Sequence, residues 1–202
     1  MPESAKASSE ADRLILVDGS GYIFRAYYAI REDMVRSDGT PTKAVFGFSN
    51  MLMKLMDDLL NETETELIAV IFDAGRATFR NEIYHEYKAN RDEAPEDLIP
   101  QFSLVRDATR AFNVACVEMK GYEADDLIAT YARLGQEKGL KVTIVSADKD
   151  LMQLVGDGIE MFDPMKQRLI GKDQVVEKFG VLPEKVIDVQ ALAGDSTDNV
   201  PG

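Results

Sequence analysis

Residues 67–73 read LIAVIFD, a run of apolar, β-forming residues that ends in an acid. The same pattern occurs at residues 14–18, which read LILVD, and at residues 142–148, which read VTIVSAD. Short apolar runs without polar alternation are typical of buried strands in a parallel sheet. We therefore expect three buried strands, each followed closely by an aspartate.

Segments with helical periodicity lie between runs of this kind. The clearest is Thr42–Leu60, in which Val45, Phe48 and Leu52 recur on one face. This alternation predicts an α/β fold with a central, mainly parallel sheet flanked by helices. The expected strands are Leu14–Val17, Leu67–Phe72, Val114–Val117, Val142–Val145 and Ile159–Phe162. The further expected helices are Phe79–Asn90, Leu98–Phe112, Ala124–Lys138, Lys172–Phe179 and Pro183–Ala193.

The composition excludes several classes of protein. The chain has 202 residues with one histidine, His85, and one cysteine, Cys116, so zinc sites built from His or Cys clusters and internal disulfides are excluded. A lone thiol favours a reducing, cytoplasmic location. No apolar run approaches the roughly 18 residues that a membrane-spanning helix needs, so we expect no membrane association. The net charge of −13 argues against non-specific wrapping of nucleic acid by simple attraction.

The position of the acids is the most informative feature. The carboxyl ends of parallel strands share one edge of a sheet, and ligands bind in the crevice there. Asp18, Asp73, Asp148 and Asp150 follow three expected strands and should therefore point to one place. Further acids occur in GYEADD, before an expected helix, and in GDSTDN, after the last one. They are Glu123, Asp125, Asp126, Asp195 and Asp198.

Each acid also has an ordinary structural explanation. An aspartate after a strand often caps the next helix, and acids in a first helical turn complement the helix dipole. Asp195 and Asp198 could simply form turns beside Gly194. Nine acids in one crevice, however, would repel one another unless cations lay between them. Oxygen ligands without His or Cys favour two or more Mg²⁺ ions, with Mn²⁺ as a substitute, and such ions indicate phosphoryl chemistry.

A second constellation lies in residues 76–93, which read RATFRNEIYHEYKANRDE. The spacing predicts that bases and aromatic residues share one helical face, where rings could stack on unpaired bases and cations could bind phosphates. These residues are Arg80, Tyr84, Tyr87, Lys88 and Arg91. The alternative is an ordinary solvated helix with Glu82 and Glu86 as ion-pair partners.

Six motifs in one order carry a family resemblance. They are VDGSGYIFRAYYA, PTKAVFGFSNML, IAVIFDAGRATFRNEIYHEYKANRDEAPEDLIPQ, GYEADDLIATYA, VTIVSADKDLMQLV and LAGDSTDNVPG. The chain resembles the 5′ to 3′ exonuclease (flap endonuclease) domain at the amino terminus of bacterial DNA polymerase I, over nearly everything after residue 12. Lys43 departs from the pattern, since a small or neutral residue is expected there.

For the fold, the resemblance implies a PIN-like flap-nuclease domain over residues 13–193 with a helical arch at about residues 76–112. Residues 1–12 are expected to be a disordered tail. Residues 194–202 are expected to begin a truncated helix-hairpin-helix region that binds DNA, since the family pattern continues past Gly202.

For the site, the resemblance assigns one metal position to Asp18, Asp73, Glu123 and Asp125, with Asp126 close by. It assigns a second to Asp148, Asp150, Asp195 and Asp198. The residues matching Lys88 and Arg91 are catalytic and stabilise the scissile phosphate. The substrate-binding set is Arg25, Arg76, Arg80, Tyr84 and Tyr87, with Tyr87 as a base-stacking partner and Arg25 on the phosphate backbone.

For the function, the resemblance implies Mg²⁺-dependent hydrolysis of DNA phosphodiesters near 5′ flaps, nicks and single-stranded 5′ ends, as in primer removal and repair, with a polymerase domain in the same polypeptide. Two alternatives stay open. A non-catalytic or weakly active nucleic-acid-binding fragment is one, and Gly19 and Gly21 weakly mimic a dinucleotide fingerprint. A metal-dependent phosphatase with Asp18 as nucleophile is the other, although Ser20 occupies the place of its usual second acid.

Overall fold

The computed structural model describes residues 12–59 and 66–202. Over these residues the sheet has six strands in the order β3-β2-β1-β4-β5-β6. Neighbouring strands from β3 through β5 pair in parallel, and β6 pairs antiparallel to β5. The strands are β1 Arg13–Asp18, β2 Glu66–Ile71, β3 Ala115–Val117, β4 Lys141–Val145, β5 Ile159–Asp163 and β6 Arg168–Ile170.

The strand order places a topological switch point at the centre of the sheet. β1 lies between β2 and β4, and its last residues pair in register with both neighbours, Asp18 with Ile71 and Val17 with Val145. The carboxyl ends of three adjacent strands, β2, β1 and β4, therefore lie next to one another at the same edge of the sheet. In open α/β sheets this is where ligands bind.

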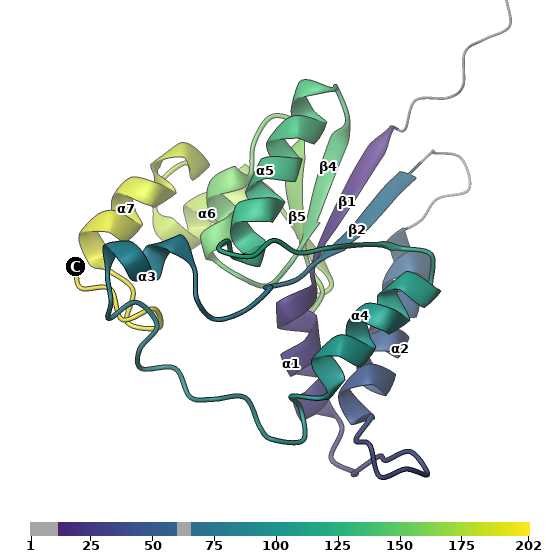
Figure 1. Cartoon of the computed structure of the whole chain (residues 1–202). Coiled ribbons are helices and arrows are strands. Elements are labelled where there is room, and N and C mark those ends of the chain that lie inside the picture. Colours follow the sequence, from purple (N-terminus) through teal and green to yellow (C-terminus); the bar gives the residue numbers. More distant parts are fainter. Residues whose placement is uncertain (1–11, 60–65) are drawn as a thin grey trace, which may run out of the picture.

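Helices cover both faces of the sheet (Figure 1). α1 (Gly19–Ala29), α2 (Lys43–Leu59) and α4 (Gln101–Ala111) lie on one side, and α5 (Ala124–Glu137), α6 (Lys172–Phe179) and α7 (Val186–Ala193) lie on the other. Alternate residues of β1 reach the two layers: Ile15 packs in the core with Phe48, and Leu16 packs in the core with Ile128. The remaining elements are short, namely α3 Phe79–Ile83 and two 3₁₀ turns, Asp150–Leu154 and Pro183–Lys185.

The predicted fold class is confirmed, and the five expected strands lie within one residue or so of their predicted ends. The prediction lacked α1, because its sequence starts with GSG, which lowers helix propensity. The structure gives the reason for these residues. Asp18 caps the helix through the Gly21 N–H, and a Cβ on Gly19 would lie 2.4 Å from the Phe72 ring. Only glycine fits between the helix and β2.

The predicted helix Phe79–Asn90 is wrong beyond Ile83, where α3 ends. Contacts with distant residues replace the helical hydrogen bonds. The Lys88 N–H donates to the Asp198 carbonyl at 2.9 Å, and Lys88 has a left-handed φ of 56°. The Asn199 amide donates to the Glu86 carbonyl at 2.8 Å. The predicted shared helical face of Arg80, Tyr84, Tyr87, Lys88 and Arg91 is therefore wrong as well.

Residues 84–100 cross from α3 to α4 as turns and extended backbone, and we call them the arch segment (Figure 1). Its far end is anchored by the buried Gln101, which accepts the Ala44 N–H at 2.8 Å and donates to the Asp97 carbonyl at 2.8 Å. Lys43, which departs from the family pattern, pairs with Asp97 at 3.6 Å and so adds to this anchor.

Little regular structure follows α7 in the described residues. Residues 1–11 of the expected tail lie outside the described residues. After α7 the backbone of Asp195 exchanges two hydrogen bonds of 2.8 Å with that of Val200, which closes the turn that holds Asp198. Within the described part of the chain, no helix is long and apolar enough to cross a membrane.

Candidate functional site

Four carboxylates converge where β1, β2 and β4 end, and we call them the acid edge. Asp18 is the last residue of β1, Asp73 and Asp148 lie just after β2 and β4, and Asp125 comes from the first turn of α5. Burial, followed by the charges of Asp18, Asp148 and Asp73, raises the pKa of Asp125 to about 8. The charges of the other three groups therefore act on Asp125 and add to the effect of burial. This confirms that the strands bring distant acids together, as the sequence predicted.

Hydrogen bonds from the backbone hold two of these groups in place. Asp18 accepts the Gly21 N–H at 3.0 Å, and Asp73 accepts the Ala124 N–H at 2.7 Å. The Asp73 peptide is held on both sides, because its N–H donates to the Ser20 hydroxyl and its carbonyl accepts from Arg106 at 2.7 Å. The carboxylates are thus fixed before any ligand arrives.

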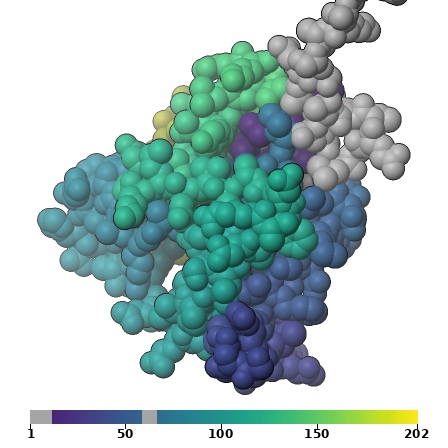
Figure 2. Space-filling view, turned by 45° about the vertical axis from the view of Figure 1, so that its right-hand side comes forward, coloured from purple at the N-terminus to yellow at the C-terminus, as the bar shows by residue number. Residues whose placement is uncertain are grey.

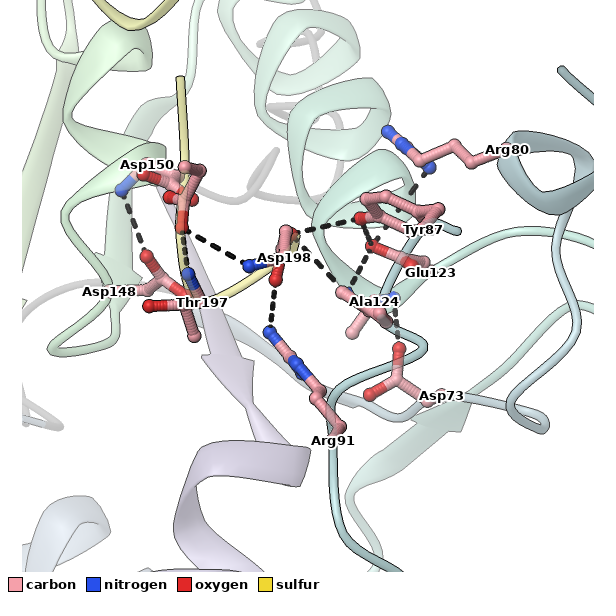
Figure 3. Close-up of polar contacts among 12 residues, drawn as sticks. Asp73, Arg80, Tyr87, Arg91, Glu123, Ala124, Asp148, Asp150, Thr197 and Asp198 are labelled. Atoms are coloured by element: carbon pink, nitrogen blue, oxygen red, sulfur yellow. Dashed lines mark hydrogen bonds and ion pairs between the residues drawn. The ribbon is translucent and has the colours of Figure 1, made fainter. Parts of the chain in front are cut away.

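A second group of acids meets the arch segment (Figure 3). Glu123, at the start of α5, accepts the Lys88 ammonium at 2.9 Å, and Asp198 pairs with Arg91. The Tyr87 hydroxyl lies 3.1 Å from Glu123 and 3.0 Å from Asp198, and its single proton serves one of the two carboxylates at a time. Burial and the two neighbouring carboxylates raise the pKa of Tyr87 above its usual range. Lys88 and Arg91 of the arch segment therefore form ion pairs with Glu123 and Asp198.

Asp126 behaves differently from its neighbour Asp125. Arg80 binds both of its oxygens, at 2.8 and 2.7 Å, and one of them also accepts the Glu123 N–H at 2.9 Å. The Arg80 guanidinium holds the pKa of Asp126 below its ordinary value. Asp126 thus joins α3 to α5 in the structure.

The last group of acids lies beyond β4. The Asp148 carboxylate accepts the Asp150 N–H at 2.9 Å. Asp150 is held by the side chain of Gln190 on α7, and Asp195 pairs with Lys149 at 3.1 Å. Burial and the charge of Asp148 raise the pKa of Asp150. All nine predicted acids therefore lie near the carboxyl ends of the strands, in three groups with different partners and with Asp126 set apart by its pairing with Arg80.

A cavity of about 720 Å³ lies between the arch segment and the end of the sheet. Figure 2 shows the surface hollowed between the residues around α3 and the residues of α4. Cations and acids from both sides meet in the cavity, and Phe24 and Phe102 give it an apolar wall. Its polar lining includes Asp73, Arg76, Tyr87, Lys88, Arg91 and Glu123.

The other predicted substrate-binding residues are placed unevenly. Arg76 lines the cavity and donates to the Arg91 carbonyl at 2.8 Å, which fixes the arch backbone. Tyr84 and Arg80 instead line a separate, mostly apolar groove with Val200. Arg25 is half-buried on α1, where its charge acts on Tyr22.

Comparison with known proteins gives the family. Residues 13–180 match the family described as 5′-3′ exonuclease, N-terminal resolvase-like domain. The chain belongs to this 5′-3′ exonuclease family. The DNA polymerase I of Rhizobium leguminosarum is 55% identical over 100% of this chain and 21% of the polymerase. The 5′-3′ exonuclease of Aquifex aeolicus is 39% identical over 94% of this chain and 64% of that protein.

A solved structure supports the fold of this 5′-3′ exonuclease domain. The flap endonuclease of bacteriophage T5, in a pseudo-enzyme-product complex with DNA and metal ions, superposes with a TM-score of 0.71 and 24% identity. The match covers 94% of this chain and 69% of that one. The chain spans about a fifth of the polymerase relative, 21% of its length.

The donor set of the exonuclease domain suits a hard divalent cation. Every candidate ligand offers oxygen, and burial together with three neighbouring carboxylates raises the pKa of Asp125. Over residues 12–59 and 66–202, however, no three His, Cys, Asp or Glu side chains are arranged as the ligands of one ion. Lys88, Arg91 and Lys149 neutralise part of the negative charge instead. The chemistry of the residues fits a metal, and the assignment of ligands to separate ions stays a prediction.

Sequence reasoning missed two residues that support the acids. Arg106 on α4 holds the Asp73 carbonyl, pairs with Glu118 at 2.6 Å and lies over the Phe72 ring. Ser146 lies between Asp18 and Asp148. The sequence signal for Ser146 was available, since it is a polar residue directly after a buried strand. Arg106 gave no signal, because it resembles any exposed base on a helix.

The stability of the metal-free exonuclease domain should fall as the pH rises. The pKa of Asp125 is about 8 in the folded chain against an ordinary value of 3.8, so at intermediate pH the folded chain holds a proton that the unfolded chain has lost. The unfolding free energy should drop by on the order of 4 kcal/mol between about pH 4 and pH 8. Urea titrations in EDTA at both ends of this range measure it.

The variant Asp125→Asn is the control, because its amide does not titrate. The difference in stability between wild type and variant isolates the contribution of this one group. A difference that stays constant from acid to neutral pH would show that Asp125 ionises normally in the folded chain.

Proposed function

We propose that this chain is a Mg²⁺-dependent nuclease that hydrolyses DNA phosphodiesters near 5′ ends, at flaps, nicks and single-stranded ends. The observation that carries the proposal is the convergence of Asp18, Asp73, Asp125 and Asp148 at one edge of the sheet, beside a cavity lined with Lys88 and Arg91. The burial and mutual repulsion of these acids lower stability unless cations lie between them.

The acids would hold the divalent ions. The proposed ligands are Asp18, Asp73, Glu123 and Asp125 for one ion, with Asp126 in a supporting place, and Asp148, Asp150, Asp195 and Asp198 for a second. Bound there, such ions lower the pKa of a water molecule and stabilise the leaving oxygen of a phosphodiester. Hydrogen bonds from Gly21 and Ala124 fix Asp18 and Asp73, so part of the ligand geometry is prepared in advance.

The cations of the arch segment would bind the substrate. Lys88 and Arg91 point toward the acids from the cavity wall, and the side chain of Arg91 is 46% exposed, so both can bind a phosphate placed between them and the acids. Tyr87 presents its ring next to Lys88, where an unpaired base can stack. We propose that Arg76 contacts DNA inside the cavity and that Arg25, Arg80 and Tyr84 contact it outside.

The relatives support the reaction class. One is named a 5′-3′ exonuclease and another a DNA polymerase I, and the T5 enzyme was crystallised with DNA and metal ions. By analogy we propose that the chain works beside a polymerase domain of the same polypeptide, in the cytoplasm. An acidic domain with a net charge of −13 needs the ions to accept a polyanion.

Cleavage of a labelled 5′-flap duplex tests the proposal. With Mg²⁺ we expect products cut near the 5′ end, and with EDTA we expect none. Para-nitrophenyl phosphate should stay intact under both conditions, because it lacks the nucleotides that the arch segment is proposed to bind.

Two results would replace the proposal with an alternative. Binding of the flap without cleavage under any divalent ion indicates a nucleic-acid-binding module. Hydrolysis of para-nitrophenyl phosphate with an intact flap indicates a phosphatase.

A further inference from the structure

Ser146 is buried directly after β4, beside the end of β1 that carries Asp18. It follows the last residue of β4, and only 2% of its surface is exposed. Its backbone N–H donates to the Phe162 carbonyl of β5 at 3.2 Å, so the main chain is held by the sheet. Its hydroxyl oxygen lies 2.9 Å from Oδ2 of Asp18 and 3.0 Å from the backbone nitrogen of Asp148.

The direction of both hydrogen bonds follows from chemistry. The Asp148 backbone nitrogen carries a hydrogen and can only donate, so the hydroxyl oxygen of Ser146 must accept from it. The single hydroxyl proton is then left for Oδ2 of Asp18, whose ionised form can only accept. One side chain thus links the ends of β1 and β4 across the switch point.

The link fixes the direction of two acids at once. Oδ1 of Asp18 accepts the Gly21 N–H at 3.0 Å, so with Ser146 both oxygens of this carboxylate are oriented. On the other side, Ser146 holds the Asp148 N–H, and the Asp148 carboxylate accepts the Asp150 N–H at 2.9 Å. The turn that presents Asp148 and Asp150 is therefore tied to Asp18 through one hydroxyl.

We propose that Ser146 is a positioning residue that sets the separation of Asp18 and Asp148 for binding of divalent cations. The inference rests on the proposed function, since it assumes that these acids hold metal. Ser146 acts through the acids and does not itself contact metal or DNA. Partners that orient metal ligands in this way typically change metal affinity or activity by about 10- to 100-fold when removed.

The variant Ser146→Ala tests the proposal, because it removes one oxygen atom and leaves the packing nearly unchanged. Titration of the chain with Mn²⁺ alone in a calorimeter should show affinity weakened by about 10-fold or more. In flap cleavage, kcat should fall while KM for DNA stays within about twofold, since the cavity lining is untouched. Ser146→Thr retains the hydroxyl and should recover most of the Mn²⁺ affinity.

Thr143→Val is the matched control on the same strand. Thr143 is 1% exposed, and its hydroxyl accepts from Arg13 at 2.9 Å and donates to Glu160 at 3.1 Å, away from the acid edge. This variant should bind Mn²⁺ like the wild type. Ser146→Cys, with a similar volume and a weak donor, should repeat the loss seen with alanine, so the test survives poor folding of either variant.

The outcomes separate the inference from the function on which it rests. A wild-type chain that takes up no Mn²⁺ overturns the proposed metal site itself. A wild-type chain that binds Mn²⁺, with Ser146→Ala and Ser146→Cys binding equally well, overturns the positioning role alone. Equal losses in Thr143→Val and Ser146→Ala also overturn it, because they indicate a general effect of buried hydroxyls on this strand.

Discussion

Replacing Asp125 by asparagine is expected to reduce flap cleavage by about 1,000-fold or more while making the metal-free chain more stable. Burial, followed by the charges of Asp18, Asp148 and Asp73, raises the pKa of Asp125 to about 8. At neutral pH the folded chain therefore holds a proton on Asp125 that the unfolded chain lacks, whereas an amide needs none, so the free energy of unfolding in EDTA should rise. The same change removes an anionic oxygen from the place where a divalent cation would bind, so catalysis should be lost. Stability and activity therefore move in opposite directions, as expected for a site whose repulsion serves its function.

The control is Asp107→Asn on α4, an acid whose side chain is 70% exposed and pairs with Arg110 at 3.1 Å. It should leave cleavage and stability nearly unchanged. If Asp125→Asn cleaves the flap within a few-fold of the wild-type rate at saturating Mg²⁺, Asp125 is not a metal ligand.

The second large effect is expected at Lys88. Replacing it by asparagine should lower kcat for flap cleavage by about 100-fold, the usual cost of losing one group that stabilises developing charge. Asparagine is chosen because Lys88 has a φ of 56°, a left-handed conformation that asparagine tolerates better than most residues. The hydrogen bond from the backbone N–H of residue 88 to the Asp198 carbonyl should persist in the variant. The fall in kcat then measures the contribution of the lysine charge.

Calorimetry with Mn²⁺ separates the two possible roles of Lys88. Affinity for the ion should be equal to or slightly higher than in the wild type, because Glu123 loses a competing cation 2.9 Å away. Lys172→Asn, at an exposed lysine paired with Asp157, is the matched control and should behave as wild type. A Lys88→Asn enzyme with normal kcat and a raised KM would place Lys88 in DNA binding only.

The sequence predicted the sheet well because its strands are apolar on both faces. Leu14–Val17 and Val142–Val145 are continuous apolar or β-branched runs, and burial between two helical layers requires this pattern. β6 was missed because Arg168–Ile170 is a three-residue edge strand with one buried residue. Such a strand forms because it pairs with β5. The hydrophobic pattern of three residues does not show that pairing.

Prediction of the site failed where the partners were distant. The acids were found because a strand end gives each a fixed place, independent of its neighbours. Residues 84–90 of the arch segment were predicted to be helical because Phe79–Asn90 has helical spacing, yet Asp198 and Asn199 supply hydrogen bonds that replace the helical ones after Ile83. These partners lie more than 100 residues away along the chain, for example at a separation of 113 for Asn199 and Glu86. Only the tertiary structure could show that residues 84–90 leave the helical conformation to make these contacts.

The contacts between residues 86–91 and residues 196–199 also have a consequence for protein synthesis. Residues 13–180, which form most of the sheet and its helices, leave the ribosome before the turn at Asp195–Val200 does. Domains generally fold as units during synthesis. Until that turn emerges, Lys88 and Arg91 have no Asp198 to pair with. The arch segment of a nascent chain would therefore lack these contacts until residues 195–200 have left the ribosome.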